Sequence, residues 1–528
     1  PGLLAEAAGR LYLDATPALR NPIGRRLIQL PFRAVDPTTA YAFPELLKDP
    51  RLAVRPVSRR VVAKVLLGLL HRSWPLPLRI VEAFHHPAQA RREAETAVAE
   101  RVARIDQISR RHMLLEEQTQ MVRVLLFGGL SSIPTRLPPL VAAGILSSFV
   151  TEALARRWGL DVSKVVAVRQ GLAGNPTTEM DLALWNLSQQ IKANPDAWRA
   201  FAEESPEAVG AAYRAGTLPE PIQAAMAAFF ERYGHRGIRE IDGGMPRWSD
   251  APEYIIGMIR NYLLLDDPAL APDRHFAELA RTAEQARGEL IAAARAQRQG
   301  WLKGAVIGFL TSRMRVLMGA REAPKFWVVR ILSIVRRILR GAGEELVRRE
   351  QLDHADDVFF LRLDELGAQT PDLKSMVARR RAAYTRELER RQLPRILTSD
   401  GTIITGRRPV GSPTTLEGIG VSPGEREGHV RVIRDPHGAH LAPGEILVAP
   451  STDPAWTPLF LTAGGLVMEA GGLLSHGSVV AREYGIPAVV GVADATARLT
   501  TGQRVRIDGA AGTVELLPDA PASAVEGD

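Results

Sequence analysis

One histidine in this sequence stands where its surroundings could make it a nucleophile. His476 follows a glycine pair, Gly471 and Gly472, and precedes helix-favouring residues that continue to Gly485. The N-terminus of a helix presents unpaired N–H groups and the positive end of the helix dipole, which favour an anion. A histidine with an ordinary pKa of about 6.5 is partly neutral at physiological pH and can then attack phosphorus. The pattern points to a phosphoryl-accepting histidine, although a histidine at a helix start is also often a cap or a surface residue.

Two apolar strands are predicted on either side of this histidine. Residues 466–468 form one apolar run, and residues 486–490 form another after the helix has ended. A serine-hydrolase elbow is disfavoured, because that motif requires glycine two residues before the serine and Leu473 stands there before Ser475. The expected local order is therefore strand, glycine turn, helix and strand.

Composition excludes several classes of site. The chain has 528 residues, which is enough for two to four domains, and its net charge of +8 is modest over that length. No Lys/Arg run is interleaved with aromatic residues, so we expect no nucleic-acid binding. The absence of cysteine excludes disulfides and thiolate ligands, and His437 and His440 lack carboxylates at matching spacing. The sequence therefore predicts no metal site.

We expect a cytoplasmic protein that does not enter a membrane. No signal peptide opens the sequence, and the apolar stretch 140–150 is shorter than a membrane span.

The remaining pattern predicts a multidomain protein, with a large mainly α-helical domain followed by a small α/β domain. Helical periodicity dominates from about residue 61 to residue 392, without a glycine-rich phosphate loop. A Gly/Pro/Thr-rich stretch follows, and beyond it short strands alternate with helices. The predicted boundaries are a helical domain at 1–395, a linker or hinge at 396–415, an α/β domain at 416–518 and a disordered tail at 519–528.

Two charged stretches of the helical region could carry function. Residues 232–249 concentrate charges of both signs in a short irregular segment, which suits either a binding loop or a salt-bridged helix connection. Residues 321–340 predict an amphipathic helix with an apolar face that includes Trp327, Ile331 and Ile338. Its arginines, Arg336 among them, are expected on a solvated face rather than on a membrane.

The segment GGLLSHGSVVAREYGIPAVVG resembles the phosphohistidine signature of the swivelling domain of phosphoenolpyruvate (PEP)-utilising enzymes. That resemblance implies that His476 is the phosphorylated catalytic residue. It also implies that Ser475, Gly477 and Arg482 stabilise the phosphoryl group. Ser475 stands where the family has Thr or Ser, and Gly477 stands where many members have Ala.

The helical region resembles the antibiotic-binding domain of rifampicin phosphotransferases, which belong to the same family. The similarity lies in R-Y-G-x-R-x-x-x-E-I-D followed by P-R-W, in the later R-E-x-x-K-F, and in DDVFFL at 356–361. It implies a substrate site, whose candidate residues are Arg236, Glu240, Asp242, Arg321, Glu322 and Lys325.

Domain order separates this sequence from PEP synthases, in which a large barrel follows the histidine domain. Too few residues follow His476 for such a barrel, so the acceptor is expected upstream, as in rifampicin phosphotransferases. That order normally begins with an ATP-grasp domain, which we expect to be missing here. ATP and Mg²⁺ would then bind to such a domain, supplied in cis or in trans, and no cofactor would bind to this chain.

The expected function is a dikinase-type phosphotransferase. His476 would carry a phosphoryl group from the ATP-binding module to a hydroxyl of a small molecule in the helical domain. The alternatives are a non-catalytic phosphocarrier or regulatory module, and the C-terminal part of a fusion with a different enzyme domain.

Overall fold

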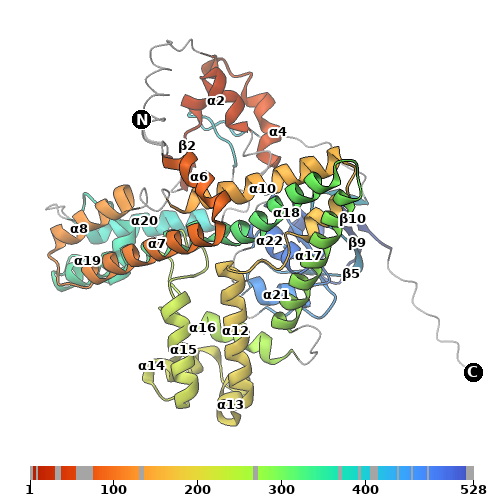
Figure 1. Ribbon diagram of the computed structural model, residues 1–528. Coiled ribbons are helices and arrows are strands. Elements are labelled where there is room, and N and C mark those ends of the chain that lie inside the picture. Colours follow the sequence, from red (N-terminus) through yellow and green to blue (C-terminus); the bar gives the residue numbers. More distant parts are fainter. Residues whose placement is uncertain are drawn as a thin grey trace, which may run out of the picture. The chain divides into compact units, whose positions relative to one another are not determined.

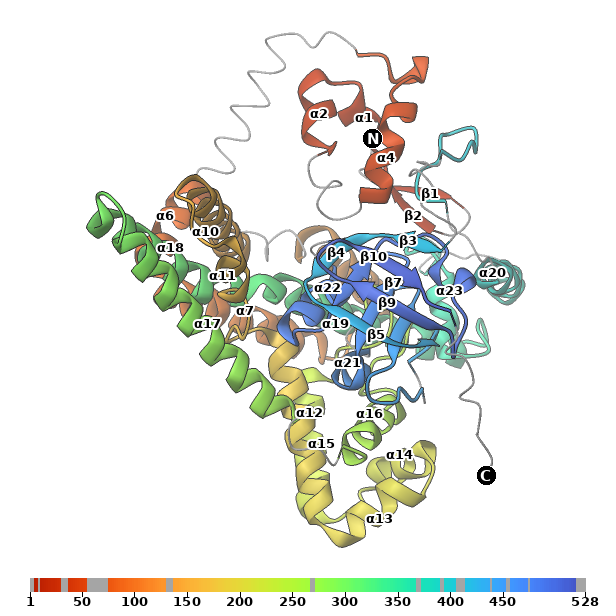
Figure 2. The same cartoon turned by 90° about the vertical axis from the view of Figure 1, so that its right-hand side faces the viewer.

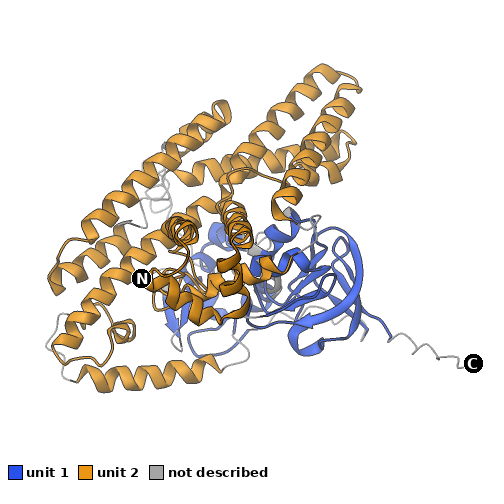
Figure 3. Ribbon diagram, turned by 90° about the horizontal axis from the view of Figure 1, so that it is seen from below, with its two compact units in different colours: residues 1–62, 390–528 blue, residues 63–389 orange. Residues whose placement is uncertain are grey.

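The computed structural model divides the chain into two compact units, residues 63–389 and residues 1–62 with 390–528 (Figure 3). It describes residues 4–7, 10–29, 37–54, 75–129, 136–265, 271–366, 372–389, 394–404, 414–436, 439–452, 456–472 and 475–518. The predicted tail at 519–528 lies outside these ranges, as does His437.

The unit 63–389 is helical throughout its described residues (Figure 1). Its longer elements are α6 (Pro75–His85), α7 (Pro87–Ser109), α8 (Leu115–Val124), α10 (Leu137–Arg157), α11 (Val162–Ala167), α12 (Pro176–Ala193), α13 (Pro195–Glu203), α14 (Pro206–Ala215), α15 (Glu220–Tyr233), α16 (Glu253–Leu263), α17 (Pro272–Arg295), α18 (Gly300–Met318), α19 (Ala323–Arg348) and α20 (Leu373–Leu388). Shorter turns are η2 (Leu125–Gly129), η5 (Gly319–Glu322) and η6 (Ala355–Phe360).

Local caps explain where several of these helices begin. Asn175, Asn194 and Ser205 precede α12, α13 and α14, and each side chain accepts a hydrogen bond from a first-turn amide. Proline follows each cap, at the position where its missing N–H costs nothing.

Helices α10 and α18 pack closely along each other (Figure 1). A Cβ at Gly144 would lie 3.0 Å from the backbone of Leu317, so a glycine permits the approach. The apolar run of α10 is longer than expected, and by length and composition alone this helix could cross a membrane. Leu137, Leu140 and Ala143 are nevertheless buried in a core shared with α7 and α19. Localisation stays a prediction.

Helix α19 confirms the predicted amphipathic helix but corrects the position of one arginine. Ile331, Ile334, Val335 and Ile338 are buried, as expected. Arg336 is also buried, because its guanidinium donates to the carbonyls of Gly243 and Gly244 and pairs with Asp250. Helical periodicity assigns Arg336 to the polar face, but the carbonyls it contacts belong to a distant loop.

The first residues of the chain group with residues 394–404 rather than with the helical unit. They form a hairpin, β1 (Leu4–Ala7) and β2 (Arg10–Leu13), followed by α1 (Thr16–Leu19), α2 (Pro22–Leu27), α4 (Pro37–Leu46) and η1 (Pro50–Leu52). Ile396 and Ile404 pack against the small core of these helices. Arg51 binds Asp400 at 2.8 Å, and the Tyr12 hydroxyl donates to the carbonyl of Pro394. Residues 396–404 of the predicted linker therefore lie on this segment, whereas Thr415 at its end already belongs to β3.

The C-terminal part of the chain contains an eight-stranded sheet in the order β3-β10-β9-β5-β6-β7-β8-β4. Its strands are β3 (Thr415–Glu417), β4 (Ile419–Ser422), β5 (Glu425–Val432), β6 (Ile446–Ala449), β7 (Gly465–Met468), β8 (Ala488–Val490), β9 (Arg504–Asp508) and β10 (Thr513–Leu516). Strands β5 to β8 run parallel, and the flanking pairs are antiparallel. A helical region followed by a mixed α/β sheet confirms the predicted fold class.

This sheet curls until its two ends meet. Strands β3 and β4 stand at opposite ends of the order, yet Gly418 alone separates them in the chain. The Gly418 amide donates to the carbonyl of Gly512 at 2.7 Å, which extends the β3–β10 ladder up to the residue where β4 begins. Figure 2 shows the curled strands with α21 (Thr457–Thr462) and α22 (His476–Glu483) beside them.

Alternating side chains of the parallel strands supply two cores. In β6, Ile446 and Val448 face a core with Ile507 and Val514, whereas Leu447 and Ala449 face a second core. The second core also holds Phe460 of α21 and Val480 and Ala481 of α22. Strands that are buried on both faces need continuous apolar runs, which is the pattern that the sequence shows.

Candidate phosphohistidine site

The strand, turn and helix predicted around His476 are present. Strand β7 leads into the glycine turn, and His476 is the first residue of α22. The helix ends before Gly485, whose φ of 67° lies in the left-handed region that glycine tolerates, and β8 follows. The imidazole of His476 lies outside what the structure describes, so the site is built here from the surrounding residues.

Ser475 occupies the cap position of α22 without capping the helix. Its side chain makes no hydrogen bond to a first-turn amide. The Ser475 hydroxyl instead lies 2.9 Å from the carbonyl oxygen of Gly472 and 2.8 Å from the Ser478 hydroxyl. Within the described residues, the first turn of α22 therefore keeps N–H groups that no cap side chain occupies, as an anion requires.

Gly477 fits a space that has no room for a side chain. A Cβ at this position would collide with the hydroxyl of Thr452 and lie 2.7 Å from the sulfur of Met468. The Thr452 hydroxyl itself donates to that sulfur at 3.2 Å. Thr452 and Met468 thus leave room for no residue larger than glycine at position 477.

Arg482 lies at the other end of the short helix. Six residues separate it from His476, which corresponds to a rise of roughly 9 Å along an ideal helix. Its guanidinium donates to the carbonyl of Val421 in β4 at 3.1 Å. The contact ties α22 to the sheet, and a role of Arg482 at the phosphoryl group stays a prediction.

Three of the six substrate-site candidates meet in the helical unit. Arg236 and Glu240, each 3% exposed, form a bidentate pair at 2.6 and 3.2 Å. Lys325 of α19, which is 41% exposed, reaches the same carboxylate at 2.9 Å. Burial would raise the pKa of Glu240, but Arg236 and Lys325 outweigh it and hold the pKa at about 2. Glu240 therefore stays ionised and fixes the Lys325 ammonium at the surface.

The other three candidates make local contacts. The carboxylate of Asp242 accepts from the amide of Gly244 at 2.8 Å, which closes a turn. Arg321 and Glu322 in η5 pair with each other at 2.9 Å and are both largely buried. The segment 232–249 is thus a salt-bridged connection in which Arg247 also donates to the carbonyls of Glu240 and Asp242. Substrate contact by any of the six stays a prediction.

Sequence reasoning missed two kinds of residue. Ser478, Thr452 and Met468 shape the start of α22, but their contacts depend on how the turn folds over β7. His235 is buried against Phe326, with 4.7 Å between the ring centroids, and both ring nitrogens lack a partner among the described residues. Burial first, and then Arg236 and Arg330, lower the pKa of His235 well below 6.5, so the ring stays neutral.

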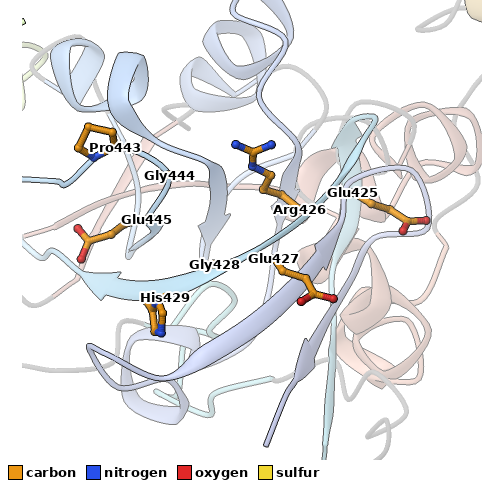
Figure 4. Close-up of a pocket in the computed structure, with 8 residues that line it drawn as sticks. All are labelled: Glu425, Arg426, Glu427, Gly428, His429, Pro443, Gly444 and Glu445. Atoms are coloured by element: carbon orange, nitrogen blue, oxygen red, sulfur yellow. The ribbon is translucent and has the colours of Figure 1, made fainter. Parts of the chain in front are cut away.

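A surface pocket of the C-terminal domain lies at the opposite end of the parallel strands from the His476 turn. Residues Glu425 to His429 of β5 and Pro443 to Glu445 before β6 line it (Figure 4). These residues belong to the amino ends of the parallel strands, whereas the His476 turn follows the carboxyl end of β7. Glu427 pairs with Arg504 and Arg506, and Glu445 with Arg431. Among the described residues, no cluster of three or more His, Asp or Glu side chains could hold a metal ion.

Comparison with known proteins defines the class to which these two parts belong. Residues 136–322 match the rifampicin phosphotransferase fourth domain, and residues 441–512 match the PEP-utilising enzyme mobile domain. The helical part of the chain is thus similar to rifampicin phosphotransferases, and its C-terminal part is similar to PEP-utilising mobile domains, as the resemblance of its motifs implied.

Individual relatives agree with this class. A Bacillus cereus rifampicin phosphotransferase is 30% identical over 538 residues, which cover 97% of this chain and 59% of the relative. A Streptomyces sviceus rifampicin phosphotransferase is 36% identical over 351 residues, covering 65% of this chain and 40% of that enzyme. An uncharacterised Mycobacterium tuberculosis protein is 33% identical over 304 residues, which cover 56% of this chain and 32% of that protein. The chain therefore spans about three-fifths or less of the curated relatives it matches.

Proposed function

We propose that this chain carries a phosphoryl group on His476 and transfers it to a hydroxyl of a small molecule held by its helical unit. The observation that carries the proposal is the start of α22 within a PEP-utilising mobile domain. There a histidine follows a serine that leaves the first-turn amides uncapped. Those amides, with the helix dipole, would neutralise the oxygens of a transferring phosphoryl group.

The transfer step needs only the histidine and the acceptor. The acceptor hydroxyl oxygen attacks phosphorus, the P–N bond to His476 breaks, and an O–P bond forms. The proton lost by the hydroxyl ends on the departing imidazole nitrogen, so the histidine returns to its neutral form. Positioning and charge stabilisation would supply most of the rate enhancement, as in other phosphoryl transfers.

The helical unit is the proposed acceptor domain. Its match to the rifampicin phosphotransferase fourth domain supports a rifampicin-like acceptor with an alcohol group. Lys325, held at the surface by Glu240, supports recognition of an oxygen-rich ligand. ATP and Mg²⁺ would bind to an ATP-binding domain in cis or in trans, and the two parts of this chain would not hold them.

The experiment is a transfer assay with the donor supplied separately. The chain is incubated with ATP, Mg²⁺ and the ATP-binding domain of a rifampicin phosphotransferase, and acid-labile phosphate is measured by intact mass. We expect one phosphoryl group on the wild-type chain and none on His476→Ala. When rifampicin is added, the wild-type chain should lose this phosphoryl group. Phosphate that persists in His476→Ala would overturn the assignment, and a wild-type chain that stays unlabelled would overturn the proposed function.

A further inference from the structure

We propose that Ser478 is a positioning residue for the phosphohistidine. Its hydroxyl anchors the carbonyl of Gly472, and this anchor frees the hydroxyl of Ser475 to turn to a phosphoryl group on His476. The inference rests on the proposed function and adds a residue that neither the sequence motifs nor the relatives assign.

Three hydrogen-bond donors share one acceptor in the turn before His476. The carbonyl oxygen of Gly472 receives the Ser475 amide at 3.0 Å, the Ser475 hydroxyl at 2.9 Å and the Ser478 hydroxyl at 2.8 Å. A carbonyl oxygen has two lone pairs, so one of the three donors is surplus. The turn therefore keeps its two hydrogen bonds even when one hydroxyl leaves.

Burial decides which hydroxyl is the surplus one. The Ser478 residue is fully buried, and among the described residues its hydroxyl has one alternative partner, the Ser475 hydroxyl at 2.8 Å. Ser475 is partly exposed and directly precedes His476. With Ser478 and the Ser475 amide on Gly472, the Ser475 hydroxyl can rotate to another acceptor without leaving a buried carbonyl short of a partner.

Without the Ser478 hydroxyl, the same rotation would cost a hydrogen bond. In Ser478→Ala the carbonyl of Gly472 would retain the Ser475 amide and hydroxyl as its donors. The hydroxyl would then be held on the turn rather than offered to the phosphoryl group. The change is chemical, since alanine fills nearly the same space as serine.

The chain offers a matched control on the same helix. Ser422 of β4 is also buried, and its hydroxyl donates to the carbonyl of Ala481 in α22 at 3.2 Å. Ser422→Ala removes a buried hydroxyl bond to the same helix but leaves the turn before His476 untouched. It reports what a purely structural loss does to phosphorylation.

The test is a double-mutant cycle on the full chain, with the ATP-binding domain supplied in trans. The rate of His476 phosphorylation is measured for wild type, Ser475→Ala, Ser478→Ala, both together, and Ser422→Ala. We expect Ser478→Ala to slow phosphorylation about tenfold, and to have no further effect on the rate when Ser475 is already alanine. The rate of Ser422→Ala should stay within about twofold of the wild-type rate. Ser478→Thr, which keeps the hydroxyl, should restore most of the rate.

Each other outcome overturns the inference. A wild-type rate in Ser478→Ala removes the role, and an equal slowing with or without the Ser475 hydroxyl makes Ser478 merely structural. If Ser478→Ala does not fold, Ser478→Thr and Ser478→Cys replace it, and equal rates in these two reject a role for a strong hydroxyl donor. A wild-type chain that takes no phosphate would reject the proposed function as well, which separates that failure from the others.

Discussion

At the scale of single residues, glycines and hydroxyls control the space around His476. Gly471 adopts a φ of 144°, and a Cβ there would lie 2.9 Å from the Ser475 hydroxyl. Gly477 faces Thr452 and Met468 at similarly short range. The turn is therefore closely packed on both sides of the histidine, so that even a small added side chain should disturb its structure.

Gly477→Ala should both destabilise the C-terminal domain and slow phosphorylation. The added methyl group would collide with Thr452 and Met468, and overpacking of this kind costs about 1–3 kcal/mol. The measurements are urea denaturation and the rate of phosphate incorporation. Thr452→Ala in the same chain removes the nearer collision and should recover part of both losses. A Gly477→Ala chain as stable and as fast as wild type would contradict the packing described here.

Glu240→Gln should destabilise the helical unit by about 3–5 kcal/mol at pH 7, because it leaves the buried Arg236 without its counter-charge. The depressed pKa, about 2, means that the ionised carboxylate stabilises the fold fully above its ordinary pKa of 4.5. This contribution is lost as the pH falls through about 2. The difference in unfolding free energy between wild type and variant should therefore narrow as the pH decreases from 4.5.

The control for this change is an exposed ion pair with the same sequence spacing. Glu345 and Arg349 are also four residues apart and lie 2.7 Å from each other, but Arg349 is 52% exposed, and Glu345 also pairs with the exposed Arg348. Glu345→Gln should alter stability far less than Glu240→Gln does. Equal effects of the two substitutions would show that burial of the Arg236–Glu240 pair does not matter.

Residue-level prediction succeeded where chemistry is local. The position of His476 at a helix start follows from the glycines and the apolar strands around it, all within one short stretch. Ser478 could not be singled out from the sequence, because the role of a serine at the third position of this helix depends on its contact with the Gly472 carbonyl, which only the folded turn provides. His235 was missed for a similar reason, since its burial depends on Phe326 in a distant helix.

At the scale of elements, capping residues and hydrophobic periodicity predicted most of the helices. The apolar runs predicted as strands at 466–468 and 486–490 correspond to β7 and β8, and the amphipathic helix predicted at 321–340 corresponds to α19. Strands β3 and β4 escaped prediction, because three or four residues around a glycine carry no readable alternation. These two strands form the two ends of the sheet, so the segment that brings the ends together was not predicted from the sequence.

Gly418→Ala should weaken this closure. A Cβ at Gly418 would collide with Val489 and lie 2.8 Å from the carbonyl oxygen of Val490. We expect a loss of about 1–3 kcal/mol in the stability of the C-terminal domain. Gly288→Ala, in α17 with nothing within 4 Å of the added Cβ, provides the control and should leave the stability of the C-terminal domain unchanged. A Gly418→Ala chain whose C-terminal domain is as stable as that of wild type would contradict the packing around Gly418.

At the scale of the whole molecule, the chain has separate cores in its two units. The helical unit is built around Ile334, Val335 and Leu317, and the curled sheet around Val448, Val467 and Ile507. The N-terminal segment belongs to the unit that contains the curled sheet, and it contacts residues 394–404 of that unit. The sequence could not reveal this grouping, because it depends on contacts between residues that are nearly 400 positions apart in the chain.

Thermal unfolding followed by calorimetry should therefore show two transitions that respond to different substitutions. Glu240→Gln removes a buried ion from the helical unit and should lower the transition of that unit alone. Gly418→Ala acts inside the sheet and should lower the other. Since each unit has a core of its own, the shift caused by one variant should leave the second transition within about 1 °C of wild type. A single transition that both variants lower together would mean that the units unfold as one cooperative body. In that case, the swing of the mobile domain expected for a phosphoryl carrier would have to break a common core.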